Sequence, residues 1–316
     1  EMTSSLVGSE MCIRDRIYAG RQDLVNMAKY YEGLIKNFPK ASPAALAEAH
    51  FLLGRAAFDQ GDFQSSISHM SEAKTLDPQK YGEQVNVLTV LSYHKLQDVN
   101  KLKEALETLQ KENPAAVSRV PDVIPAWLGL QAYGMKDLET ADKYMTWATQ
   151  NDQLQNVKKV IWRNLAKVRL ALKKYDRALV ASNNFLKVED QPYRRADGML
   201  DKASILLGLG KYADARKTAE EALALGVEGP LMASLKIVLG DISYAEKKFD
   251  EAAKHYGVTA ELFVNDAELK PKALFKAAEA LDKAGRKSEA SQYRARLQKE
   301  FPDWKQEGES LPPDAR

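Results

Sequence analysis

The sequence predicts an all-α solenoid built from antiparallel helix pairs. Pairs of amphipathic helical patterns, separated by short turns, recur along most of the 316 residues, with small side chains at matching places. Self-similarity at a period of this length indicates stacked units that bury a core between neighbours. Hydrophobic residues make up 45% and charged residues 28% of the chain, which suits a folded protein and not a disordered one.

The N-terminal segment, residues 1–16, differs from everything that follows it. It has no helical period, no strand alternation and no apolar core of a secretory signal, and it resembles a translated sequencing-adapter fragment. We therefore expect a non-native or disordered segment. Its Cys12 is the single cysteine of the chain, so an internal disulfide is excluded and the redox compartment stays open.

The helical region is expected over residues 17–304. It opens with residues 23–39, which have the pattern of a second helix lacking its first, and so form a half repeat. The first full unit follows at residues 47–78, where two amphipathic patterns flank the turn at Gly61 and Asp62. Residues 305–316 are polar and contain prolines, which predicts a disordered tail.

Six further units follow, the first of them, between Pro78 and Pro121, being degenerate. Each unit has one small or apolar anchor at the same place in its second helix: Ser66, Leu102, Ala141, Ala178, Ala215, Ala252 and Ala290. By subtraction these anchors lie 36, 39, 37, 37, 37 and 38 residues apart. Small side chains at such positions let two helices approach closely.

These units resemble the tetratricopeptide repeat. Its pattern of a leucine-glycine pair, small residues, an aromatic after the turn and a closing proline is matched by Leu53, Gly54, Ala57, Phe63, Ser66, Ala73 and Pro78, with serine where alanine is usual. The observed spacing exceeds the usual period of about 34 residues. The resemblance implies about seven repeats plus an N-terminal half repeat in a right-handed superhelix, with the first helices lining a concave groove.

Known catalytic and cofactor motifs are missing from the sequence. The string Gly208–Ala213 matches a phosphate-binding G-x-G-x-x-A pattern, but it follows a helix and lies in a turn, where Gly210 would permit the chain reversal. The four histidines lie too far apart in sequence for a local metal motif. We therefore predict no enzyme, no cofactor and no metal site.

The function is expected in the groove. Projected from the family register, its lining includes Val87 and Ala126 and, as candidate peptide-binding residues, Leu91, His94, Leu130, Tyr133, Arg163 and Lys167. Such a strip would suit an extended or helical peptide with an acidic group. The alternative is that these residues only pack or face water. The lysine, asparagine and arginine pattern that grips chaperone tails is not reproduced, because Asp197 and Asp201 stand on the next repeat.

We expect a non-catalytic scaffold that binds a peptide or protein segment in this groove. Two alternatives stay open: a structural, self-assembling module of a larger envelope complex, and the regulatory fragment of an enzyme whose catalytic domain lies upstream. The net charge of only +2, without a basic tract, disfavours nucleic acid as partner. No apolar run approaches the roughly 18–20 residues of a membrane span.

Location is the least determined property of the chain. Residues 30–63 and 275–302 resemble repeats of envelope-associated bacterial tetratricopeptide proteins, including outer-membrane assembly and Tol-Pal accessory proteins. That resemblance favours the periplasm or cell envelope of a bacterium, with the cytoplasm as the alternative. The identity of the partner and the oligomeric state are not fixed by any feature of the sequence.

Overall fold

The computed structural model describes residues 24–150, 155–262 and 266–305, and every regular element in these ranges is a helix. The segment 1–16 and residues 306–316 of the tail lie outside the described residues. Contacts between residues divide the chain into two compact units, residues 1–131 and 132–316.

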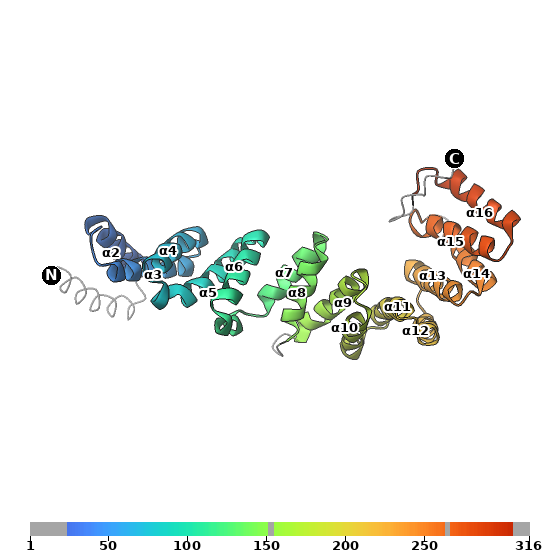
Figure 1. Cartoon of the computed structure of the whole chain (residues 1–316), viewed down its shortest axis with the longest axis horizontal. Helices are drawn as coiled ribbons and strands as arrows, with labels where there is room; N and C mark the ends of the chain where they lie inside the picture. The colour runs from blue at the N-terminus through green and yellow to red at the C-terminus, as the bar shows by residue number, and fades with distance from the viewer. Residues whose placement is uncertain (1–23, 151–154, 263–265, 306–316) are drawn as a thin grey trace. The chain divides into compact units, whose positions relative to one another are not determined.

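In the first unit, the helices from α2 to α6 each pack on the next one along the chain, and α6 also packs on the short helix that follows it. They are α2 (Leu24–Asn37), α3 (Pro43–Gln60), α4 (Phe63–Leu76), α5 (Pro78–Leu96) and α6 (Val99–Glu112), followed by the 3-10 helix η1 (Pro114–Arg119) and most of α7 (Val123–Gly134). Figure 1 shows α3 beside α4 in blue, with α5 and α6 following. Helix α2 packs on α3, as the predicted half repeat requires.

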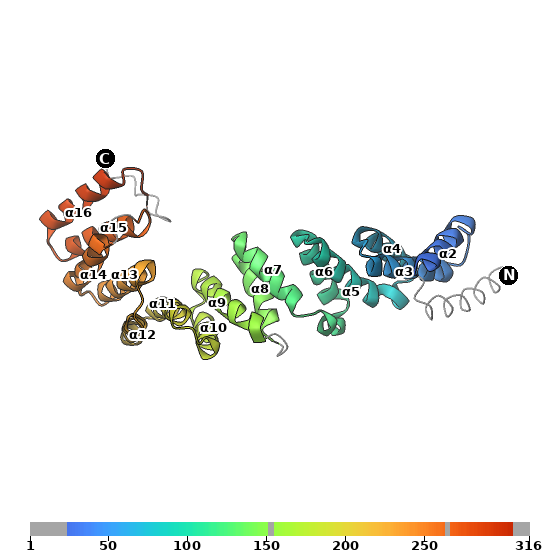
Figure 2. The ribbon, with the colours of Figure 1, turned by 180° about the vertical axis from the view of Figure 1, so that it is seen from behind.

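The second unit continues the same arrangement. It contains α8 (Leu138–Ala148), α9 (Gln155–Ala171), α10 (Tyr175–Val188), α11 (Pro192–Gly208), α12 (Tyr212–Ala224), α13 (Gly229–Ala245), α14 (Phe249–Leu262), α15 (Leu269–Lys283) and α16 (Lys287–Glu300). Neighbouring helices of this set pack on each other, as both views show for α9 and α10 (Figures 1 and 2). Counted along the described chain, seven helix pairs follow α2, which confirms the predicted number.

Each pair turns at one residue in the left-handed region of backbone conformation. The positive φ angles belong to Gly61 (83°), Gln97 (56°), Lys136 (63°), Lys173 (57°), Gly210 (72°), Lys247 (62°) and Gly285 (79°). These residues have the same 36 to 39 residue spacing as the anchors. Only glycine adopts this conformation without strain, so the glycine at three of the seven turns, Gly210 among them, has the structural role predicted for it.

The predicted anchors are completely buried in the stack. All seven, from Ser66 to Ala290, are 0% exposed. Glycines on the first helices admit large side chains of a packed helix, both within a pair, as for Gly240 of α13 and Tyr256 of α14, and between repeats, as for Gly208 of α11 and Tyr175 of α10. A Cβ atom on Gly208 would lie 2.4 Å from the ring of Tyr175, and one on Gly240 would lie 2.4 Å from the ring of Tyr256. The small residues of the pattern therefore specify how closely the helices pack, and the register taken from the sequence is confirmed.

Ion pairs connect neighbouring repeats of the stack. Arg169 of α9 pairs with Asp142 of α8 at 2.7 Å, and both side chains are only 9% exposed. Lys276 of α15 pairs in the same way with Asp241 of α13 at 2.8 Å. Because each repeat touches only its neighbours, such pairs contribute to the interface between repeats and not to one central core.

Candidate functional site

The first helices of successive repeats contact each other in addition to their own partners. In the second unit these contacts join α9 to α11, α11 to α13 and α13 to α15. Within the second unit, the first helices α9, α11, α13 and α15 therefore form one continuous surface, which we call the first-helix face. Of the six candidate peptide-binding residues, Arg163 and Lys167 lie on α9, the first helix of this face.

Three of those six residues, Leu91, His94 and Leu130, belong to the first unit and are partly buried. The His94 ring packs edge-on against Trp127 with ring centroids 5.5 Å apart. Burial, helped by the neighbouring charge of Lys95, lowers the pKa of His94, so its ring is neutral at pH 7. Ala126, assigned to the same strip, is 2% exposed and belongs to the core.

The other three, Tyr133, Arg163 and Lys167, belong to the second unit and are also partly buried. Arg163 and Lys167 lie in one cavity of about 360 Å³, whereas the other four candidates are not among its lining residues. The walls come from three helices: Lys159, Val160, Arg163, Asn164 and Lys167 of α9, Phe185 at the end of α10, Glu189 just after it, and Arg194 of α11. We call this space the α9 cavity.

The α9 cavity combines an apolar side with polar groups. Val160 is 50% exposed, although it is an aliphatic residue on an otherwise packed helix. The guanidinium carbon of Arg163 lies 6.0 Å from the centre of the buried Phe185 ring. The Asn164 side-chain amide donates to the Val160 carbonyl at 2.9 Å, which leaves its own carbonyl oxygen as an acceptor.

Carboxylates of the same unit already neutralise most cations of the α9 cavity. Arg163 pairs with Asp197 and lies 3.8 Å from Asp201, which is also 4.0 Å from Lys167. Lys159 pairs with Asp190 at 3.2 Å. Burial raises the pKa of Asp201 to about 6 although Lys167 and Arg163 lower it, so Asp201 is mostly ionised at pH 7. The aspartates noted in the sequence thus reduce the net positive charge of this face.

Sequence reasoning missed several residues of the α9 cavity. Lys159 precedes Arg163 and Lys167 at steps of four residues, and Val160 precedes Asn164 by four. Helical spacing alone places these side chains on one face of α9, so extending the predicted stripe by one turn would have found them. Phe185, Glu189 and Arg194 come from other helices, and their approach to α9 follows only from packing.

Within the described ranges, no group of three or more His, Cys, Asp or Glu side chains could hold a metal ion. Among the helices of the same ranges, none is both long and apolar enough to cross a membrane.

Three segments of the chain, residues 47–80, 200–263 and 272–303, match the family described as tetratricopeptide repeat. The chain is a tetratricopeptide-repeat protein. The matched segments contain the α3–α4 pair, parts of the repeats from α11 to α14, and the α15–α16 pair. Comparison with curated proteins found no matching relative.

Three solved structures of similar fold are each 13–15% identical to this chain. The apo form of RapI is 15% identical, with a TM-score of 0.50, over 83% of this chain and 78% of RapI. The apo quorum sensor NprR from B. thuringiensis is 14% identical, with a TM-score of 0.45 over 90% and 84%. MamA from Desulfovibrio magneticus RS-1 is 13% identical, with a TM-score of 0.46 over 56% and 93%. The likeness to RapI shows the solenoid fold and nothing more.

Proposed function

We propose that this tetratricopeptide-repeat protein is a non-catalytic scaffold that binds a segment of a partner protein on its first-helix face. The fold supports a role in protein–protein interaction. The observation that carries the finer proposal is the α9 cavity, where exposed Val160 lies beside polar groups in a space of about 360 Å³. Binding sites of this kind combine an apolar lining with a few polar groups that orient the ligand.

The chemistry of the α9 cavity defines the segment that would fit it. An aliphatic or aromatic side chain of the partner would cover Val160 and contact the edge of Phe185. The free acceptor of Asn164 and the exposed Arg194, which has no ion-pair partner among the described residues, would bind the partner's backbone or polar side chains. Because Asp197 and Asp201 balance Arg163 and Lys167, we expect a segment of mixed charge, not a strongly acidic one.

Peptide display tests this proposal. A library of random 12-residue peptides is selected on residues 17–316, and the enriched peptide is titrated calorimetrically against wild type and two variants. Val160→Asp places a charge at the α9 cavity. Val180→Asp is the matched control, because Val180 is 57% exposed on α10 and does not line the cavity. Both substitutions add the same charge at exposed valines of one repeat.

We expect Val160→Asp to weaken peptide binding at least tenfold, which is about 1.4 kcal/mol, while Val180→Asp changes it less than twofold. Equal affinities for all three proteins would place the peptide elsewhere and refute the proposed site. A library that yields no binder on wild type would argue against the scaffold role itself. Substituting Arg163 is avoided, because its loss would leave Asp197 and Asp201 without their cation.

A further inference from the structure

A larger space lies on the opposite side of the same repeats, between second helices. A cavity of about 560 Å³ is lined by Asn183, Leu186, Lys187, Arg195, Met199, Lys202, Thr218 and Glu221. A neighbouring one of about 350 Å³ shares four of these residues and adds Leu179, Leu206, Lys211, Asp214 and Lys217. Together they form one groove, which we call the α10–α12 groove.

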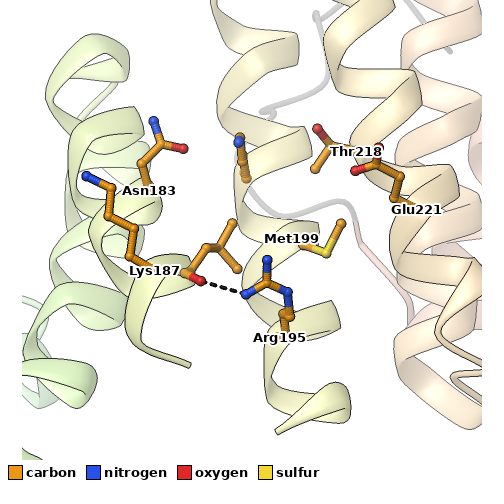
Figure 3. Close-up of a pocket in the computed structure, with 8 residues that line it drawn as sticks. Asn183, Lys187, Arg195, Met199, Thr218 and Glu221 are labelled. Carbon is orange, nitrogen blue, oxygen red and sulfur yellow. Dashed lines mark hydrogen bonds between the residues drawn. The ribbon is translucent and has the colours of Figure 1, made fainter. Parts of the chain in front are cut away.

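The groove results from how the repeats stack. First helices α9 and α11 contact each other, but no comparable contact joins second helices α10 and α12 in the described chain. Figure 3 shows the consequence: Asn183 and Lys187 on α10 lie across from Thr218 and Glu221 on α12, with Arg195 and Met199 of α11 between them. Helix α11 therefore forms the floor, to which Met199 and Leu206 contribute apolar surface.

The charges around the groove are unbalanced. Five cations line it, Lys187, Arg195, Lys202, Lys211 and Lys217, against two carboxylates, Asp214 and Glu221. Lys217 lies 4.0 Å from Glu221, and Arg195 donates to the carbonyl oxygens of Leu186 and Glu189 at 2.6 and 3.2 Å. Lys187, Lys202 and Lys211 have no ion-pair partner among the described residues. This surplus contrasts with the α9 cavity, where aspartates neutralise the cations.

Lys211 is the most informative of these lysines because it occupies a helix N-cap. A cation is unfavourable there, since the first turn of a helix exposes donors and partial positive charge. At two equivalent N-cap positions, the cation forms ion pairs with carboxylates of the preceding repeat. Lys174 pairs with Glu139 and Asp142, and Arg286 pairs with Asp250.

Within the described part of the chain, no carboxylate of the preceding repeat pairs with Lys211. One repeat after Asp142 the sequence has Leu179, and one repeat after Glu139 it has Asp176, which makes no ion pair with Lys211. Leu179 lines the groove instead. Asp214 in the first turn of α12 complements the positive end of the helix, but among the described residues no carboxylate pairs with the Lys211 ammonium, which stays available for a ligand.

We propose that the α10–α12 groove is a second docking surface, which binds an acidic segment of a partner protein. Carboxylates of that segment pair with Lys187, Lys202 and Lys211 along the rim, and its apolar side chains cover Met199, Leu186 and Leu179 in the groove. Complementary charge at such a surface selects the partner and speeds its association. The surface is distinct from the α9 cavity, so the scaffold holds two segments on opposite faces of the same repeats.

The test uses a fluorescein-labelled 12-residue peptide of four Asp-Glu-Leu units as probe and an Asn-Gln-Leu peptide as control. Anisotropy gives the Kd at 50 mM salt for wild type and for the variant Lys187→Glu, Lys202→Glu, Lys211→Glu. The matched control variant is Lys254→Glu, Lys283→Glu, Lys287→Glu. These are exposed lysines of the same unit, without ion-pair partners among the described residues and outside the groove, and the net charge change is identical. Circular dichroism melts verify that both variants fold.

We expect the groove variant to bind the acidic probe at least tenfold more weakly than wild type, the control variant to bind within about threefold, and the Asn-Gln-Leu peptide to bind poorly to all. Equal losses in both variants would reduce the effect to general charge attraction and overturn the proposal. A 12-nucleotide single strand of DNA that binds as tightly, with the same loss, would point to nucleic acid instead and also overturn it.

Two further measurements distinguish binding in the α10–α12 groove from binding at the α9 cavity and from self-association of the chain. Val160→Asp must leave the affinity for the acidic probe within about twofold of wild type, because the α9 cavity does not contribute to the groove. Sedimentation at increasing concentration must give the same mass for wild type and the groove variant. A wild-type dimer that the groove variant abolishes would show that a second copy of the chain occupies the groove, contrary to the proposal.

Discussion

Replacing Arg169 by methionine should destabilise the interface between α8 and α9 more than any surface substitution. The Arg169 Nε donates to Asp142 Oδ1 at 2.7 Å, and its Nη2 donates to the Thr146 hydroxyl at 2.7 Å. Breaking a buried ion pair on one side typically costs 3–5 kcal/mol. Lys174, whose ammonium is 3.0 Å from Asp142, keeps part of the attraction, so we expect a loss of about 3 kcal/mol, at the low end of that range.

A double-mutant cycle checks this value. Urea unfolding is measured for wild type, Arg169→Met, Asp142→Asn and the double variant, together with hydrogen exchange of the amides in α8 and α9. The double variant should be more stable than the sum of the single losses predicts, because no buried charge is left unpaired, with a coupling of about 1–3 kcal/mol. If each single variant lost less than about 1 kcal/mol of unfolding free energy, or if amide hydrogen exchange in α8 and α9 were unchanged, the ion pair would not stabilise this interface.

Acid titration gives an independent test of the same pair. Burial raises the pKa of Asp142, but the hydrogen bonds and charges of Arg169 and Lys174 outweigh it, so its pKa in the folded state lies below the usual value. The corresponding stabilisation is complete above the unfolded-state pKa of about 3.9 and is lost as the pH falls through the folded-state pKa. Arg169→Met should therefore lose less stability than wild type on acidification below about pH 5.

Three other predictions concern single positions. Lys173→Gly should raise stability by about 0.5–1 kcal/mol in thermal unfolding, because a left-handed lysine costs more than the entropy of glycine; a lower melting temperature would contradict the strain. Ser66→Ala should raise the urea midpoint, since the buried Ser66 Oγ has no hydrogen-bond partner among the described residues; a drop would reveal an unseen partner. The Nδ1 atoms of His50 and His69 lie 3.1 Å apart, and burial lowers the pKa of both rings. The stability that these neutral rings contribute is present above pH 6.5 and is lost as the pH falls. The variant carrying both His→Gln changes should therefore show a smaller drop in Tm from pH 7.5 to 5.5 than wild type. Parallel curves of Tm against pH for the two proteins would show that the histidine pair does not cause the pH dependence.

The repeat architecture could be predicted from the sequence because its determinants are local and recur. Whether a helix pair can pack closely depends on side-chain size at one position per helix, and Ala178, Ala215 and Ala252 mark that position at a constant spacing. The left-handed turn follows the same period. Where glycine is replaced, as at Lys173, the turn survives because the flanking helices impose it. Composition and spacing therefore determined the fold class, the number of repeats and the register.

The candidate sites depended on features that no local pattern contains. Sequence reasoning assigned Arg163 and Lys167 to the first-helix face, but only the packing of α9 on α11 brings Asp197 and Asp201 close enough to neutralise them. In the α10–α12 groove, Lys211 has no ion-pair partner among the residues that the structure describes, although lysine at the equivalent position 174 is paired. Which charges pair and where space remains between helices both depend on distances between residues about a repeat apart, and these distances exist only after the helices have stacked.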